Sequence, residues 1–185
     1  RNKGVLESDK DTKYFAFTDS DCYVHKNWLK ILVDTIEKTT KNIQCVGGIN
    51  LTPHSDNSIA KLTGKIEQTK LGGGNTAQTK IFRKLTRVNS IPNCNALYKK
   101  DIWANNKQDE SLITGQDGEF NYRILKKGGR FLINPKAIVW HHRPSTLKKY
   151  LKRMYNYGKA SSKILFKQNN KINFIKSRWY GFIPP

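Results

Sequence analysis

The sequence predicts an α/β fold, because short apolar runs typical of strands alternate with amphipathic segments typical of helices. The run from Tyr14 to Thr18 is rich in β-formers and too short for a helix, so it predicts a buried strand. Residues 27–36 place their apolar side chains on one helical stripe, which predicts an amphipathic helix packed on the sheet. A chain of 185 residues fits one domain with a proper core.

The middle of the chain predicts a second strand, a second helix and a loop. Residues 43–48 indicate a short strand that ends at a glycine turn. Residues 56–70 have a weaker helical pattern. The apolar positions of that pattern are Ile59, Leu62 and Ile66. Residues 71–75 are rich in glycine and predict a loop, either a hinge or a plain linker, because no Gly-Lys-Ser/Thr follows to make a phosphate-binding loop.

In the second half of the chain, predicted strands and helices again alternate. Residues 89–98 predict part strand and part turn, and residues 100–103 predict a short helix. A longer helix is expected from Asp117, with acidic residues in its first turn and Gly128 after its last. Residues 130–140 predict strand segments that end at two histidines.

Residues 146–167 predict a basic amphipathic helix. Its expected apolar side consists of Leu147, Tyr150, Leu151, Met154 and Tyr155. Such helices lie in the interface of anionic bilayers, and the aromatic segment 179–185 is of the kind found at membrane boundaries. The alternative is a helix packed on the rest of the domain. We therefore divide the chain into residues 1–145 and a helical, membrane-proximal segment of residues 146–185.

The charge of the chain indicates an anionic partner. Lysine and arginine outnumber aspartate and glutamate by 34 to 14, which gives a formal net charge of +20. Nucleic acid, anionic lipid and phosphate-bearing substrates all fit this charge. The three cysteines form neither a disulfide framework nor a zinc pattern in sequence, which fits a reducing compartment. No apolar run approaches the length of a membrane span.

Two carboxylates stand where the first predicted strand ends. Asp19 and Asp21 are spaced i, i+2, so their charges repel unless a partner is present. Hard cations such as Mg²⁺ and Mn²⁺ prefer carboxylate oxygen and often bind through one or two carboxylates plus substrate phosphates. The same residues are also common in turns and helix N-caps, so these positions alone leave both interpretations open.

Taken together, these segments resemble family 2 glycosyltransferases of the GT-A fold over nearly the whole chain. Residues 1–4, Arg-Asn-Lys-Gly, resemble the family's Arg-Asn-x-Gly segment. Residues 15–21, Phe-Ala-Phe-Thr-Asp-Ser-Asp, resemble its DxD motif, and residues 93–98, Asn-Cys-Asn-Ala-Leu-Tyr, are similar to its acceptor-side strand. Residues 109–117 match its acidic segment followed by Glu-Asp, with Gln116 where glutamate is usual. His141 or His142 matches a histidine after the last strand.

The resemblance implies a GT-A (Rossmann-like) mixed sheet flanked by helices and a metal-dependent, inverting sugar transfer. The donor would be a nucleotide-diphosphate sugar, the acceptor a hydroxyl of a glycan or lipid-linked molecule, and the cofactor Mn²⁺ or Mg²⁺. The implied metal ligands are Asp19, Asp21, His141 and His142, with no choice made between the histidines. The implied general base is Asp117, for which a helix N-cap is the alternative. The implied donor- or acceptor-binding residues are Arg1, Asn2, Asn93, Asn95, Gln116 and Arg123.

The resemblance also implies that a strand, a helix and a second strand for the nucleotide base precede Arg1, so we expect an N-terminally truncated fragment. We expect it at the cytoplasmic face of a membrane, on an anionic surface. Two other classes compete. A basic nucleic-acid-binding module fits the charge, but the basic residues are spread along the chain and no binding motif occurs, so no nucleic acid is expected. A glycoside hydrolase would use two carboxylates, but a strand-end DxD suits a metal better.

Overall fold

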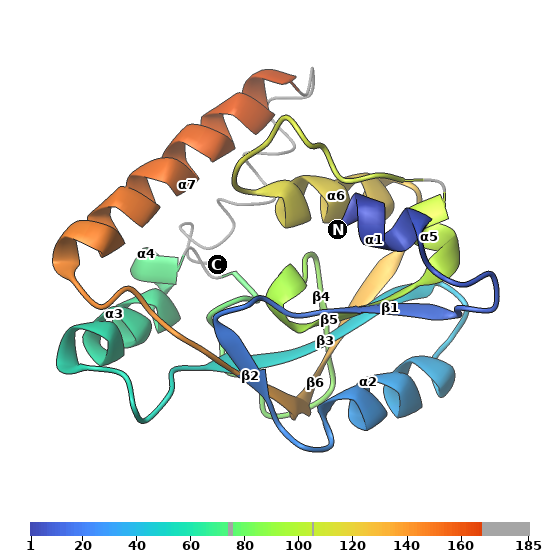
Figure 1. Ribbon diagram of the computed structural model, residues 1–185, viewed down its shortest axis with the longest axis horizontal. Coiled ribbons are helices and arrows are strands. Elements are labelled where there is room, and N and C mark those ends of the chain that lie inside the picture. Colours follow the sequence, from blue (N-terminus) through green and yellow to red (C-terminus); the bar gives the residue numbers. More distant parts are fainter. Residues whose placement is uncertain (74–75, 105, 168–185) are drawn as a thin grey trace, which may run out of the picture.

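A computed structural model describes residues 1–73, 76–104 and 106–167 of the chain. It confirms the α/β fold: helices flank a six-stranded mixed sheet (Figure 1). The strands are β1 (Tyr14–Phe17), β2 (Cys22–Val24), β3 (Ile43–Leu51), β4 (Thr86–Val88), β5 (Ala96–Lys99) and β6 (Arg130–His141). The helices are α1 (Asn2–Leu6), α2 (Trp28–Glu37), α3 (Ser58–Gln68), α4 (Lys70–Gly73), α5 (Lys100–Ala104), α6 (Gln116–Lys126) and α7 (Leu147–Lys167), with a 3-10 turn η1 (Asn93–Asn95).

The sheet has the order β1-β5-β3-β6-β2, and β4 also pairs with β6. The central pair β3–β6 is parallel, and every other described pair is antiparallel. Opposite its β3 edge, β6 pairs with β4 along residues 131–133 and with β2 along residues 139–141. The β2–β6 register places Cys22 opposite His141. The segment that follows β1 is thereby held beside the end of β6.

Apolar side chains cover both faces of the sheet. Trp28, Leu32 and Ile36 of α2 pack on one face, as the helical stripe predicted, whereas Leu29 of the same stripe is exposed. Phe120 and Ile124 of α6 belong to the core on the other face. Along β6, Phe131 and Ile133 join the α6 side while Leu132 joins the α2 side, because successive strand residues point to opposite faces.

The expectation that residues 14–18 form a buried strand is only partly right. A strand does form there, but its residues are half-buried and Ala16 is exposed. The reason is position: β1 is an edge of the described sheet and pairs with β5. Composition predicts a strand but does not say how many neighbours it has.

The expected glycine turn after residue 46 is wrong, because β3 runs on through both glycines to Leu51. A Cβ atom on Gly47 would lie 2.6 Å from the Asn95 carbonyl oxygen. A Cβ atom on Gly48 would lie 1.7 Å from the Ala137 carbonyl oxygen. The two glycines therefore serve close approach of neighbouring backbone rather than chain reversal. The β3–β6 register shifts at the same place, and Pro135 of β6, which has no N–H to donate, lies within that irregularity.

Helix α3 forms close to the predicted range but turns the opposite face inward. Its apolar positions Ile59, Leu62 and Ile66 are 41%, 57% and 39% exposed. The residues it buries are Ala60, Thr63, Gly64 and Glu67. The small residues allow close packing, since a Cβ atom on Gly64 would lie 2.3 Å from the Thr52 hydroxyl oxygen and 3.6 Å from Arg143 Cγ. The expected loop at residues 71–75 is helical up to Gly73, in α4, and residues 74–75 lie outside the described ranges.

Two further helices, α6 and α7, form where the sequence predicts them. Helix α6 begins at Gln116 and the chain leaves it through Gly128, whose φ of 88° suits glycine. Helix α7 packs on the rest of the protein: among its described side chains, Tyr150, Ala160 and Ile164 are buried. Of the expected apolar side, Tyr150 is buried and Met154 is half-buried, whereas Leu147, Leu151 and Tyr155 are exposed. No helix in the described ranges is long and apolar enough to span a bilayer, and the segment 179–185 lies outside them.

Candidate active site

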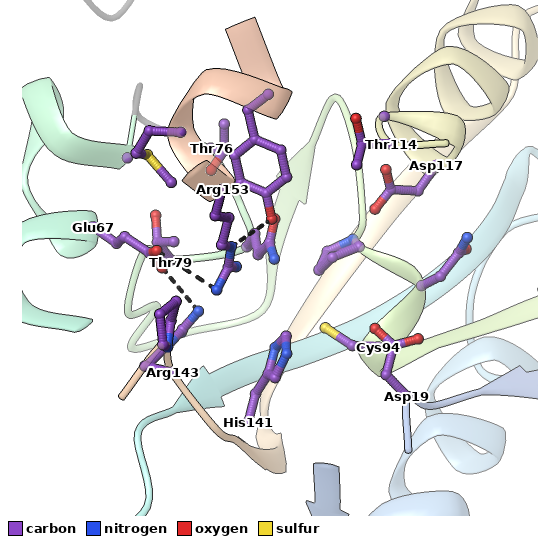
Figure 2. A pocket seen from close by; sticks show the side chains of 18 of the residues that line it. Asp19, Glu67, Thr76, Thr79, Cys94, Thr114, Asp117, His141, Arg143 and Arg153 are labelled. Carbon is purple, nitrogen blue, oxygen red and sulfur yellow. Dashed lines mark hydrogen bonds and ion pairs between the residues drawn. The ribbon is translucent and has the colours of Figure 1, made fainter. Parts of the chain in front are cut away.

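A pocket of about 860 Å³ opens between the sheet and α7. Figure 2 shows that its labelled side chains fall on two sides with His141 between them. The acidic side comprises Asp19, Asp21 and Asp117, together with His141. The basic side comprises Arg143, Lys149 and Arg153, together with Glu67. A pocket of this size can enclose a small-molecule substrate.

Asp19, Asp21 and His141 form a compact group of hard-metal ligands. One ligand atom from each lies within 4.8 Å of the others, and His141 Nε2 is 3.3 Å from Asp21 Oδ2. Burial lowers the pKa of His141, although the Asp21 carboxylate acts in the opposite direction. The imidazole is therefore neutral at neutral pH, the form that binds metals.

The backbone holds this group from several sides. Asp19 and Asp21 follow β1, and the Cys22 N–H donates to the Asp19 carbonyl over 3.1 Å. The His142 N–H donates to the Asp21 carbonyl, also over 3.1 Å. Two carboxylates and one imidazole are donors that fit Mg²⁺ or Mn²⁺. Arg1 contacts the Asp19 carboxylate, so a cation there would compete with the guanidinium for one oxygen.

His142 does not join this group, so the expectation that it is a metal ligand is corrected. Its Nδ1 lies 2.5 Å from Asp56 Oδ1, and the neighbouring Arg143 N–H donates to Asp56 Oδ2 over 3.0 Å. Consecutive residues of an extended chain point in opposite directions, so only one of the two histidines can face Asp21.

Asp117 enters the pocket from the first turn of α6, on the same side as Asp19 and Cys94 (Figure 2). The N-cap position belongs to Gly115, whose φ is 79°, so Asp117 is not the cap residue. Its Oδ1 accepts a hydrogen bond of 2.8 Å from the Gly118 N–H. A carboxylate near the helix N-terminus is stabilised by the helix dipole.

Two thiols lie beside the acidic side. Cys22, Cys94 and His141 also form a group whose ligand atoms lie within 4.8 Å of one another. A hydrogen bond from the Cys94 thiol lowers the pKa of Cys22. The same hydrogen bond, together with burial, raises the pKa of Cys94 well above its usual value.

The basic side is built on a buried ion pair that sequence reasoning missed. Arg143 Nη1 donates to Glu67 Oε2 over 2.9 Å, and both side chains are almost fully buried. Arg153 Nη1 lies 3.8 Å from Glu67 Oε1, and its Nε donates to the Tyr157 hydroxyl. The two arginines thus share one carboxylate, and Lys149 also lines the pocket. The sequence does not indicate that Glu67 is buried, because the apolar positions of residues 56–70 predict that the opposite face of the helix packs inward.

Comparison with known proteins gives the family of this chain. Residues 7–156 match the family described as "Glycosyltransferase like family 2". The chain belongs to this family. Its fold is consistent with GT-A.

Two curated relatives of this family 2 protein extend the comparison. One is a "Dolichyl N-acetyl-alpha-D-glucosaminyl phosphate 3-beta-D-2,3-diacetamido-2,3-dideoxy-beta-D-glucuronosyltransferase" from Methanococcus voltae, 28% identical over 98% of this chain. The other is a "Pre-mycofactocin glycosyltransferase" from Mycobacterium tuberculosis, 22% identical over 92% of this chain. The chain spans 56% of the first relative's length and 35% of the second's.

Three of the expected substrate-binding residues of this glycosyltransferase line the pocket: Arg1, Asn93 and Gln116. The buried Asn93 Nδ2 has no hydrogen-bond partner within the described protein, so it can donate to a ligand. Gln116 Nε2 donates to the Leu112 carbonyl and helps to place the start of α6.

The other three have structural roles, which corrects the expectation for Asn2, Asn95 and Arg123. Asn2 exchanges hydrogen bonds with the Gln108 backbone and donates to Glu110, so it ties α1 to that segment. The Asn95 side chain accepts from Trp28 Nε1 and donates to two strand carbonyls. Arg123 binds Glu119 and the Lys107 carbonyl, and it does not line the pocket.

Proposed function

We propose that this family 2 glycosyltransferase moves a sugar from a nucleotide-diphosphate donor to a hydroxyl of a phosphate-bearing, lipid-linked acceptor. One observation carries the proposal: a single pocket has a metal-ligand group and a candidate base on one side and three cations on the other. The metal ion can then bind the donor diphosphate, while the cations on the basic side bind the acceptor phosphate.

The acidic side suits the donor. Asp19, Asp21 and His141 would hold Mn²⁺ or Mg²⁺, and Arg1 and Asn93 are placed to contact the donor. When bound, such a cation neutralises the charge of the leaving diphosphate. The residues themselves orient the donor so that its anomeric carbon faces the acceptor.

Asp117 suits the role of general base. In the proposed reaction the acceptor oxygen forms a bond to the anomeric carbon as its proton passes to the Asp117 carboxylate. The bond from that carbon to the diphosphate oxygen breaks in the same displacement. Because attack and departure occur on opposite faces, the configuration inverts.

The basic side suits the acceptor. Arg143, Lys149 and Arg153 carry more positive charge than Glu67 balances, and arginine binds phosphate in bidentate fashion. The Methanococcus voltae relative is named for a dolichyl-linked sugar phosphate, which supports an acceptor of this chemistry. The exposed stripe Leu147, Leu151 and Tyr155 on α7 supports docking on an anionic membrane, which we propose to be its cytoplasmic face.

The test is metal-dependent donor binding and turnover by the purified protein. Nucleotide-diphosphate sugars are titrated by calorimetry with Mn²⁺, with chelator, and with the variant Asp21→Asn. We expect binding that is lost with chelator and with Asp21→Asn, and sugar transfer onto polyprenyl-phosphate-linked sugars. Donor binding that survives both treatments would overturn the metal assignment, and equal transfer onto acceptors without phosphate would overturn the role of the basic side.

A further inference from the structure

The proposed sugar transfer leaves two thiols at the edge of the pocket without a role. Cys22 begins β2, Cys94 lies in η1, and the β2–β6 register brings His141 opposite Cys22. The two sulfur atoms and one imidazole nitrogen lie within 4.8 Å of one another. Cys94 and His141 line the pocket, so a small ion in the pocket can reach them.

Two thiolates and one imidazole prefer a different metal from the neighbouring carboxylates. Thiolate and imidazole ligands suit zinc, whereas Mg²⁺ and Mn²⁺ prefer carboxylate oxygen. With Zn–S and Zn–N bonds of about 2.3 and 2.0 Å, tetrahedral ligand atoms lie roughly 3.5–4 Å apart. The observed separations are within a small side-chain movement of that arrangement.

We propose that Cys22, Cys94 and His141 form a site for a thiophilic divalent cation such as Zn²⁺, with a water or pocket ligand in the fourth position. Binding would release the thiol protons to solvent as the thiolates bind the ion. Because His141 also belongs to the Asp19–Asp21 group, occupancy of the thiol site removes a ligand from the hard-metal site. Both ions would use the same imidazole nitrogen, so the two sites exclude each other, and a thiophilic ion would inhibit the enzyme. Only this inhibition rests on the proposed function; the binding does not.

Cobalt is the probe for binding, since Co²⁺ bound to thiolate has a charge-transfer band in the near ultraviolet. Titration of the reduced protein with Co²⁺ should give this band, and Zn²⁺ should abolish it. The variants Cys22→Ser and Cys94→Ser should each lose the band. The matched control is Cys45→Ala, because Cys45 is a free cysteine buried in the sheet core away from the pocket, and it should keep the band. Circular dichroism confirms that each variant is folded.

A second measurement tests the sharing of His141. Zn²⁺ should displace Mn²⁺ from the wild-type protein, seen as an increase in the electron paramagnetic resonance signal of free Mn²⁺. Asp21→Asn should lose Mn²⁺ binding but keep the cobalt band, so failure of the proposed function would not be mistaken for failure of the thiol site. No cobalt band in the wild type, or a band that persists in both cysteine variants, would overturn the thiol site. Simultaneous binding of Mn²⁺ and Zn²⁺ would overturn the exclusion.

Discussion

His141 Nε2 lies 3.3 Å from Asp21 Oδ2, and this contact joins the end of β6 to the segment that follows β1. The contact depends on the antiparallel β2–β6 pairing, which aligns the two segments. His142, the next residue, faces Asp56 instead. Substitutions of the two histidines are therefore expected to affect metal binding differently.

His141→Asn should weaken Mn²⁺ binding at least about tenfold, because it removes or displaces a ligand of the proposed metal group. His142→Asn should bind Mn²⁺ close to wild type and serves as the matched control. Electron paramagnetic resonance titration measures both affinities. Equal losses in the two variants would show that the choice of His141 is wrong.

The buried His141 should also make the protein less stable in acid. Burial lowers its pKa in the folded state, so the unfolded chain binds the proton more tightly. The stabilisation is complete above the unfolded pKa of about 6.5 and is lost as pH falls through the folded pKa. The melting temperature should therefore fall less between about pH 7.5 and about pH 5 in His141→Gln than in wild type. An equal fall in both proteins would contradict this.

Asp117→Asn should abolish turnover without loss of donor or metal binding. A general base acts only as the acceptor proton moves, and its contribution is about 10²–10⁴-fold. The matched control is Glu119→Gln, two residues along α6, because Glu119 pairs with Arg123 and does not line the pocket. Single-turnover transfer and calorimetric donor binding are the measurements. Near-normal transfer by Asp117→Asn with an inactive Glu119→Gln would mean that the base is misplaced.

Glu67→Gln should destabilise the protein by about 3–5 kcal/mol, because Arg143 would be left buried without its carboxylate. Asp34→Asn breaks the exposed Lys30–Asp34 pair on α2 and should cost at most about 1 kcal/mol. Urea denaturation measures both. A loss for Glu67→Gln as small as that of the surface control would show that the pair is not a structural element of the pocket.

The exposed stripe on α7 should contribute to membrane binding. Leu151→Ser with Tyr155→Ser should reduce partitioning onto anionic vesicles at least about tenfold, since two large apolar side chains lose their burial in the bilayer interface. Ile113→Ser is the control, because Ile113 is 94% exposed in a segment outside α7. Vesicle sedimentation measures the partitioning. Equal binding to neutral and anionic vesicles by the wild type would instead favour a helix that only packs on the domain.

Local sequence pattern was enough to predict helices such as α2 and α6. The stripe through Trp28, Leu32 and Ile36 predicted α2, and the acidic first turn with Gly128 predicted α6. These signals are readable because helix periodicity and capping act between residues that are near in sequence. The carboxylates Asp19 and Asp21 were found for the same reason, as a charged pair directly after a strand.

Only the tertiary structure shows which residues that are distant in sequence form hydrogen bonds and ion pairs with one another. Asn95 was expected to bind donor or acceptor, but its side chain accepts from Trp28 Nε1 of α2 and donates to the Ile49 carbonyl of β3. The sequence does not indicate a role for Glu67, which α3 buries beside Arg143.

The cysteines show the same division most clearly. Cys22 and Cys94 are too far apart in sequence to form a metal pattern, and residue spacing alone excluded one. The β2–β6 register and the η1 turn bring both sulfur atoms to His141. Sequence determined which donors the chain possesses and which helices and strands carry them. Strand pairing decided which donors meet, because hydrogen bonding between strands joins segments irrespective of their separation along the chain.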